Sequence, residues 1–291
     1  MASCITVAAL PTWAQNQINN KLRWKPTDLT ALNQTLAELE HVSRGRLGVT
    51  LLDAVNGQTF SYRGDERFLM LSSFKTLAAA YVLARSDKGE DQLDRRVPIT
   101  EADLLDYAPV TRLHIGQQGM TLAELCHATI TTSDNTAANL ILRSYGGPRA
   151  LTRFIRSLGD SVTRHDRYEP ELNQLNSLEP TDTTSPNAMS NTLNTLLFGT
   201  ALKSESRQLL WSWLVANTTG DRRLRAGVPS DWIIGEKTGT ARTGANDVGF
   251  VQAPGSSPVI VSVYLETDAL AASERDQIIA AVGRHVVEVI G

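Results

Sequence analysis

The chain has 291 residues, of which 42% are hydrophobic and 20% charged, and it carries a net charge of −3 with a pI near 6.0. This balance, with no run of like charges, argues against nucleic acid and anionic membranes as partners. The apolar runs are too short for stable membrane insertion, and the length suits one large domain or two closely packed ones.

The N-terminus resembles the second half of a secretory leader. Residues 4–10 are largely apolar, and Thr12 and Ala14 occupy the two positions that a signal peptidase reads. We expect residues 1–14 to be a truncated signal peptide that is cleaved after Ala14. A disordered tail is one alternative. A lipid anchor at Cys4 is another, and it is disfavoured because no apolar run precedes that cysteine.

The first predicted elements are a helix and a hairpin. Within residues 27–41, leucines recur at the spacing of an amphipathic helix. Residues 47–53 and 59–62 predict two strands, and Asn56-Gly57 between them is a strong hairpin signal.

The middle of the chain predicts mainly helices, with start signals that are serine, threonine or asparagine caps. These helices are expected to begin at Ser72, at the capping boxes of Thr100 and Thr121, at Asn135 and at Ser185. Residues 162–184 follow neither a helical nor a strand period, so we interpret them as a long ordered loop. A loop of that length usually serves a function.

Strand character returns near the C-terminus, at residues 232–238, 247–252 and 258–266, before a final helix at 271–290. Strands at both ends of the chain therefore enclose the helices.

This arrangement predicts a discontinuous α/β domain formed by residues 15–66 and 220–291. Residues 67–219, including the long loop, are predicted to form an inserted helical domain.

Four short motifs lie in order along these elements. They are Ser-Ser-Phe-Lys at 72–75, Ser-Asp-Asn at 133–135, Glu-Pro-Glu-Leu-Asn at 169–173 and Lys-Thr-Gly at 237–239. Each alone has a commonplace explanation, such as a helix cap or a polar turn. Together they supply a nucleophile, bases, a proton shuttle and an anion clamp, which acyl transfer through a covalent serine intermediate requires.

The first motif places Ser72 and Lys75 on one helix face, so the amine can reach the hydroxyl. The positive end of the helix dipole favours developing negative charge at Ser72. A lysine desolvated at the start of an apolar helix can lose its proton near neutral pH and act as a base.

The third motif can hold a water molecule between Glu169 and Asn173, four residues apart, as base and positioner. An acylated serine is a dead end unless water attacks the ester, so this pair would complete a hydrolytic cycle. The bond between Glu169 and Pro170 is a candidate cis peptide.

The remaining motifs suit substrate binding. Asn135 offers both a donor and an acceptor for an acylamino group. Lys237 and Thr238 can bind a carboxylate, and Gly239 lets the strand lie close to a ligand.

The order of these motifs is that of class A β-lactamases and penicillin-binding proteins, and the chain resembles a class A serine β-lactamase from about residue 26 onward. The resemblance implies an α/β fold with an antiparallel five-stranded sheet flanked by helices. It also implies an inserted all-helical domain, with the active site in the cleft between the two parts.

The resemblance implies hydrolysis of the β-lactam ring of penicillins and cephalosporins, and mechanism-based inhibitors as further ligands. It implies a monomer without cofactor or metal; the five histidines show no ligand spacing. With the leader-like N-terminus, it implies a periplasmic or secreted bacterial protein.

Further roles come from the resemblance alone. Ser133 would pass a proton to the leaving nitrogen, and the N–H groups of Ser72 and Thr240 would form the oxyanion hole. Tyr107 would form an aromatic wall of the cleft. Arg223 matches a position that supplies a further cation in some relatives, and a solvated basic loop is the alternative.

The long loop would be closed by an ion pair between Arg167 and Asp182, and Asn139 would hold Glu169 from the helical side. Whether Lys75 or Glu169 activates the serine is left open.

The sequence also bears on the substrate range. Many carbapenem-hydrolysing relatives bridge two cysteines at the positions of Leu71 and Ala241, which argues against carbapenem turnover here. Some relatives bridge Cys126 to the position of Ala79, and that bridge is also missing. Arg242 could attract an acidic substituent on an oxyimino cephalosporin, which would extend the spectrum.

Three competing classes share part of this signature. A D,D-peptidase or penicillin-binding protein has three of the four motifs and lacks the Glu169–Asn173 pair. A non-catalytic penicillin sensor would stay acylated, and a serine esterase of the Ser-x-x-Lys type would also lack Glu169. The third motif therefore favours a hydrolase.

Overall fold

The structure is a computed structural model that describes residues 23–176 and 178–291. The predicted leader at 1–14 lies outside the described residues.

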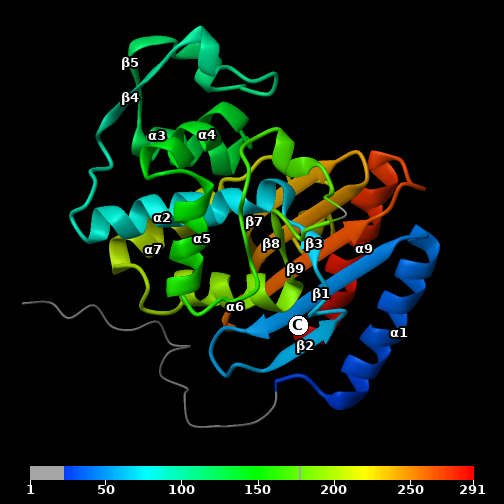
Figure 1. The fold of residues 1–291 in the computed structure, drawn as a ribbon. Helices are drawn as coiled ribbons and strands as arrows, with labels where there is room; N and C mark the ends of the chain where they lie inside the picture. Colours follow the sequence, from blue (N-terminus) through cyan, green and yellow to red (C-terminus); the bar gives the residue numbers. More distant parts are fainter. Residues whose placement is uncertain (1–22, 177) are drawn as a thin grey trace, which may run out of the picture.

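A five-stranded antiparallel sheet forms the centre of the molecule (Figure 1). Its spatial order is β2-β1-β9-β8-β7, so the N-terminal hairpin pairs with the C-terminal strand. The strands are β1 (Arg46–Asp53), β2 (Thr59–Tyr62), β7 (Ile233–Ala241), β8 (Gly244–Gln252) and β9 (Val259–Glu266). This confirms the predicted sheet, including the hairpin at Asn56-Gly57.

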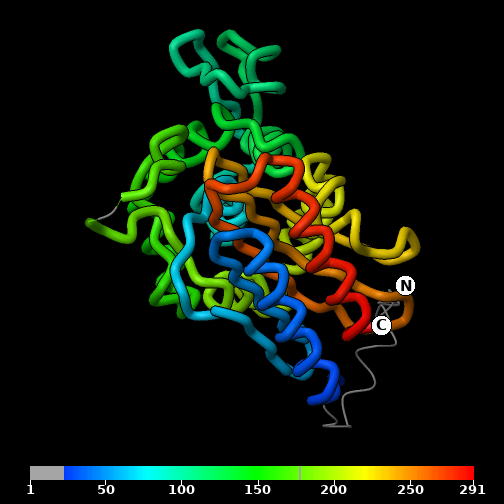
Figure 2. The backbone as a smooth tube through the Cα atoms, turned by 90° about the vertical axis from the view of Figure 1, so that its right-hand side faces the viewer, coloured from blue at the N-terminus to red at the C-terminus, as the bar shows by residue number. Residues whose placement is uncertain are grey.

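Two terminal helices cover one face of the sheet. Helix α1 (Pro26–Ser43) and helix α9 (Ala272–Ile290) lie side by side on it, as the blue and red tubes in Figure 2 show. Leu36, Val261 and Val282 are fully buried in the hydrophobic cluster between these helices and the sheet. Burial of this apolar surface fixes both chain ends to one scaffold.

Helices from the middle of the chain cover the opposite face. The main ones are α2 (Phe74–Asp87), α6 (Pro186–Leu197) and α7 (Ser204–Val215). Phe250 of the sheet stacks on Trp211 of α7, with ring centroids 3.7 Å apart. Tyr264 of the sheet and Phe74 of α2 belong to the same buried cluster. One continuous core therefore joins the two predicted domains, whose boundaries remain a prediction.

Shorter elements complete the fold around the site. They are β3 (Phe68–Leu69), η2 (Leu71–Ser73), β4 (Arg96–Ile99), η3 (Glu101–Asp103), η4 (Thr111–Leu113), β5 (Gly116–Thr121), α3 (Leu122–Thr131), α4 (Asn135–Ser144), α5 (Pro148–Ser157), η5 (Glu171–Asn173), β6 (Thr183–Thr184) and α8 (Leu224–Gly227).

Several elements differ from the sequence prediction. The helix expected at Ser72 starts at Phe74, because the turn η2 comes first. The capping box at Thr100 serves only the three-residue η3. The β4–β5 hairpin was not predicted, because its strands bury few side chains and so lack a clear alternating pattern. Helices α5 and α7 were not predicted either.

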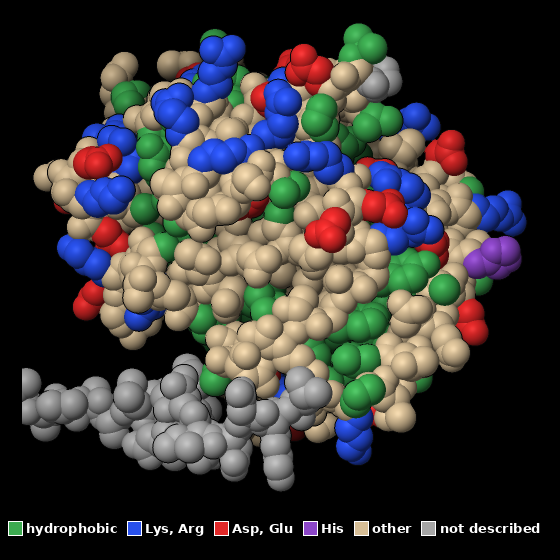
Figure 3. Space-filling model, turned by 60° about the horizontal axis from the view of Figure 1, so that its bottom comes forward, with side chains coloured by type: hydrophobic (Ala, Val, Ile, Leu, Met, Phe, Trp, Pro, Cys, Tyr) green, Lys and Arg blue, Asp and Glu red, His purple; other side chains and the backbone are tan. Residues whose placement is uncertain are grey.

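The surface matches the small net charge. Figure 3 shows both basic and acidic side chains on the face that it presents. None of the helices in the described part of the chain combines the length and the apolar character that a bilayer crossing needs.

Candidate active site

Ser72 lies in η2, at the point where β3 passes into α2. Asn246 of β8 donates from Nδ2 to the carbonyl oxygens of Leu69 and Met70, at 2.8 and 3.0 Å. Leu71 adopts a left-handed conformation with φ of 49°. The sheet thus holds the backbone before the nucleophile in a conformation that leucine rarely adopts.

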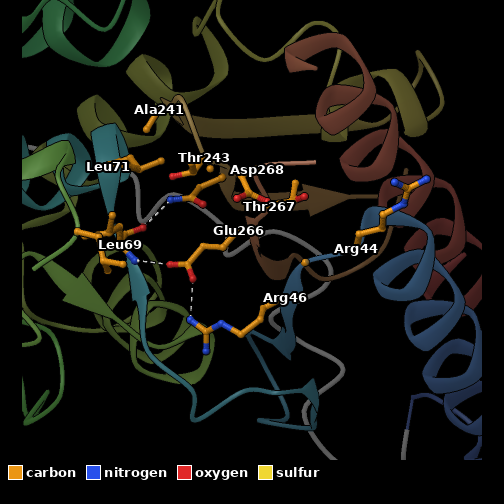
Figure 4. Close-up of a pocket in the computed structure, with 13 residues that line it drawn as sticks. Arg44, Arg46, Leu69, Leu71, Ala241, Thr243, Glu266, Thr267 and Asp268 are labelled. Atoms are coloured by element: carbon orange, nitrogen blue, oxygen red, sulfur yellow. Dashed lines mark hydrogen bonds and ion pairs between the residues drawn. The ribbon is translucent and has the colours of Figure 1, made fainter. Parts of the chain in front are cut away.

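The reverse side of this segment borders a cavity of about 320 Å³ (Figure 4). There the Glu266 carboxylate accepts a hydrogen bond from the Leu69 N–H at 3.3 Å and pairs with Arg46 at 2.7 Å. Both backbone polar groups of Leu69 are therefore bound to side chains of the sheet.

Lys75 and Glu169 form a buried ion pair beside the nucleophile, with Nζ 3.2 Å from Oε1. Ser72 Oγ donates to the same carboxylate oxygen at 3.4 Å. Burial lowers the pKa of Lys75, and the negative charge of Glu169 opposes that shift. Glu169 Oε1 thus contacts both the Ser72 hydroxyl and the Lys75 ammonium.

The second motif meets Lys75 from the other side. The Lys75 ammonium donates to the Ser133 carbonyl at 2.8 Å, to Ser133 Oγ at 3.3 Å, and to Asn135 Oδ1. Asp134 caps α4 and accepts hydrogen bonds from the backbone N–H groups of Val110 and Thr111. That carboxylate therefore anchors the turn, and the left-handed Ser133, with φ of 61°, directs its hydroxyl into the site.

The fourth motif brings a second buried lysine to the same hydroxyl. Lys237 Nζ donates to Ser133 Oγ at 3.1 Å and to the Thr238 carbonyl at 2.8 Å. Burial, and then the nearby charge of Lys75, hold the pKa of Lys237 well below its usual value. Position 239 requires glycine for a steric reason, because a Cβ atom there would lie 2.8 Å from the Cβ atom of Leu71.

The long loop carries Glu169 into the site, and Asn139 of α4 holds it there. Asn139 bonds both the N–H and the carbonyl of Glu169, at 3.0 and 2.9 Å, and the bond to Pro170 is cis. Asn173 Nδ2 donates to Glu169 Oε2 at 2.6 Å.

The base of the loop is closed by Arg167, whose Nε lies 2.6 Å from Asp182 Oδ2. His165 is buried next to this pair and stacks on Phe74, with ring centroids 4.2 Å apart. Burial lowers its pKa to about 4, so the ring is neutral at pH 7.

Arg223 is buried and held by the protein, which excludes a solvated basic loop at this position. Its Nε lies 2.7 Å from Asp276 of α9, and Nη1 donates to the carbonyls of Gly239 and Asn246, each at 2.8 Å. Its Nη2 donates to Thr240 Oγ1 at 2.7 Å. The side chain therefore fixes the end of β7.

A buried carboxyl pair lies behind the fourth motif and was missed by sequence reasoning. Burial, and then the proximity of Glu236, raise the pKa of Asp247 well above its usual value. Arg225 contacts Glu236 at 2.9 Å. The strand that carries Lys237 thus lies on two carboxyl groups whose burial favours the protonated form.

These groups surround a cleft with a volume of about 420 Å³. Tyr107, half exposed, is among its lining residues. The predicted site residues that line it are Ser72, Tyr107, Ser133, Asn135, Glu169, Asn173, Arg223, Thr238 and Thr240. Lys75, Lys237 and Gly239 are absent from that lining and reach the site through the contacts given above.

Four further residues line the cleft without having been predicted: Thr219, Arg222, Ala272 and Asp276. Only the fold brings them to the site, and none belongs to a recognisable motif. Within residues 23–176 and 178–291, no group of three or more His, Cys, Asp or Glu side chains is arranged to hold a metal ion.

Comparison with known proteins gives one family. A model described as the β-lactamase enzyme family matches residues 31–290. The chain is 47% identical over 270 residues to β-lactamase L2 of Stenotrophomonas maltophilia, which covers 91% of this chain and 88% of that protein. It is 42% identical over 266 residues to β-lactamase OXY-2 of Klebsiella oxytoca, with 91% of each chain covered.

Solved structures agree. An ancestral (GNCA) class A β-lactamase superposes with a TM-score of 0.86 at 57% identity, over 88% of this chain and 99% of that one. A β-lactamase from Xanthomonas campestris superposes with a TM-score of 0.88 at 44% identity, over 91% of this chain and 99% of that one. The fold and these relatives define a hydrolase of β-lactam antibiotics. The chain belongs to the β-lactamase enzyme family and is a class A serine β-lactamase. Its hydrolytic activity confers antibiotic resistance.

Buried His165 generates a prediction about stability. Its pKa is about 6.5 when unfolded and about 4 when folded, so the unfolded state binds more protons between these values. Stability must therefore fall as the pH drops from 6.5 to 4, by about 3 kcal/mol from this residue alone. We expect His165→Leu to flatten that part of the curve of unfolding free energy against pH, measured by urea denaturation.

The matched control is His114→Gln, which changes an exposed histidine. It should keep the slope of the unaltered protein. Equal slopes for His165→Leu and the unaltered protein would contradict the buried neutral ring.

Proposed function

We propose that the chain hydrolyses penicillins and cephalosporins through an acyl-enzyme at Ser72, which is released by a water molecule that Glu169 activates. The observation that carries the proposal is the position of Glu169, whose carboxylate lies within 3.4 Å of Ser72 Oγ and 3.2 Å of Lys75 Nζ. A penicillin trap needs the serine and the lysines but has no use for this carboxylate.

In the acylation step, Ser72 Oγ bonds to the β-lactam carbonyl carbon and gives its proton to a base. Glu169 contacts the hydroxyl directly, and Lys75 contacts the same Glu169 oxygen, so the base would be Glu169 or, after a small movement, Lys75. The oxyanion of the tetrahedral intermediate would be bound by the N–H groups of Ser72 and Thr240. The C–N bond then breaks as the ring nitrogen takes a proton from Ser133.

Substrate orientation would come from opposite ends of the cleft. We name Lys237, Thr238 and Thr240 the carboxylate clamp, because their ammonium and hydroxyl groups can bind the carboxylate of the antibiotic. Arg223 would act through Thr240, to which it donates at 2.7 Å. Asn135 and Asn173 would bind the acylamino side chain, with Tyr107 as a wall.

In the deacylation step, Glu169 would take a proton from water as the water oxygen attacks the ester carbonyl, and Asn173 would help position that water. Ser72 leaves with a proton, and the product is a penicilloate-type acid. The loop contacts of Asn139 and the pair Arg167–Asp182 support this role, because they fix the Glu169 carboxylate within the site. We further propose that the protein is periplasmic or secreted and acts as a monomer.

Hydrolysis of a chromogenic cephalosporin at many equivalents of substrate tests the proposal. We expect continuous turnover by the unaltered protein and no acylation of Ser72→Ala, because the bond-forming oxygen is gone. A burst that equals the enzyme concentration, followed by no further release, would instead indicate a penicillin sensor or a penicillin-binding protein.

Glu169→Ala tests the separate role of the loop carboxylate. We expect this variant to form the acyl-enzyme and then stall, with kcat lowered by about 10³-fold or more because general-base catalysis is lost. Intact-protein mass spectrometry would detect the accumulated adduct. Normal turnover by the variant would contradict the assignment.

Arg242 provides a test of the substrate range. It is exposed in the turn between β7 and β8. We expect Arg242→Glu to raise the KM for an oxyimino cephalosporin with an acidic acyl substituent, by about fivefold at low salt. Unchanged kinetics with that substrate would show that Arg242 does not attract it.

A further inference from the structure

The protein itself uses most of the donors of Arg223. A guanidinium has five N–H groups, and four of these are bound to Asp276, Gly239, Asn246 and Thr240. The side chain is only 7% exposed. It has one donor left for a ligand and cannot turn toward a substrate without breaking these bonds.

Its neighbour Arg222 is in the opposite situation. Its side chain is 83% exposed and lines the same cleft. Its one ion pair among the described residues runs from Nε to Asp276 Oδ2 at 3.2 Å. Both terminal nitrogens, with four N–H groups in a planar fork, therefore have no partner in the part of the chain that the structure describes.

The local charge balance favours an anion at this place. Asp276 is the carboxylate nearest to Arg222, but it is shared with Arg223, which lies closer to it at 2.7 Å. Two arginines and one carboxylate leave an excess positive charge. Asp221, the next acidic residue, pairs with Arg225 at 3.6 Å.

Arg222 also has a defined position relative to the carboxylate clamp. Through Asp276 it is linked to Arg223, which donates to Thr240 of the clamp. Glu169 and Asn173 reach the cleft from the long loop instead. Arg222 therefore belongs to the clamp end of the cleft.

We propose that Arg222 forms an accessory anion subsite, which selects β-lactams that carry a second anionic group beside the ring carboxylate. The inference rests on the proposed function, since it takes the clamp as the site of the first carboxylate. Suitable groups are a carboxylate, a sulfonate or an acidic heterocycle on the ring side of the substrate, because the fork can donate to two oxygens at once. An anion on the acylamino side chain would point away from this end.

A pair of cephalosporins tests the subsite. Both carry the same uncharged acyl side chain, and they differ in whether the substituent at ring carbon 3 is neutral or anionic. The readout is the ratio of kcat/KM for the anionic substrate to that for the neutral one. We expect Arg222→Gln to lower this ratio about fivefold at low salt, mainly through KM, and Arg222→Glu to lower it further.

The matched control is Arg284→Gln, which removes an equal charge from the exposed surface of α9, outside the cleft lining. It should leave the ratio unchanged. A third cephalosporin, neutral at carbon 3 and anionic in its acyl side chain, should respond to Arg242→Glu and not to Arg222→Gln.

The outcomes separate the two proposals. If the unaltered protein turns over both members of the pair but Arg222→Gln keeps the ratio, the subsite is wrong while the proposed function stands. An equal fall in the control, or an equal effect of Arg222→Gln on the third substrate, would also overturn it. Failure of the unaltered protein to turn over the neutral cephalosporin would overturn the proposed function itself.

Discussion

The ion pair between Lys75 and Glu169 is the constraint around which the site is organised. Removing two charged groups from water costs several kcal/mol of free energy for each group. Their mutual attraction offsets this cost only if hydrogen bonds satisfy the remaining donors and acceptors. Here Ser133 and Asn135 accept from the Lys75 ammonium, and Ser72 and Asn173 donate to the Glu169 carboxylate. Helices α2 and α4 and the long loop must all be in place for the pair to exist, so the fold and the site are formed together.

Positive charge also accumulates at the active site. Lys75, Lys237 and Arg223 converge on one cleft, and burial lowers the pKa of both lysines. Such an arrangement is costly without a ligand and favours an anionic one, which suits the carboxylate of a β-lactam. Glu169 pairs with Lys75 and Asp276 with Arg223, but burial raises the pKa of Asp247, so these carboxyl groups balance only part of the charge.

The long loop makes the difference between a trap and a hydrolase. Ser72, Lys75, Ser133 and Lys237 could acylate in any protein that recognises penicillin. Glu169 and its neighbours add the means of release. In the described structure this carboxylate is held through the backbone by Asn139, and the loop is tied at its base by Arg167 and Asp182. The motif least informative on its own therefore carries the functional conclusion.

The sequence by itself determined the parts of the chemistry, because the four motifs and the periodic strands and helices are local patterns. The five-stranded sheet, α1 and α9 follow from such patterns. The hairpin β4–β5 was missed because its strands bury few side chains. The tertiary structure alone decided that internal hydrogen bonds occupy most donors of Arg223, and that the terminal nitrogens of Arg222 have no partner among the described residues. It also decided that Asp276 of α9 lines the cleft. These facts depend on contacts between residues about 16 to 54 positions apart, and no local pattern can encode which donors such contacts leave unpaired.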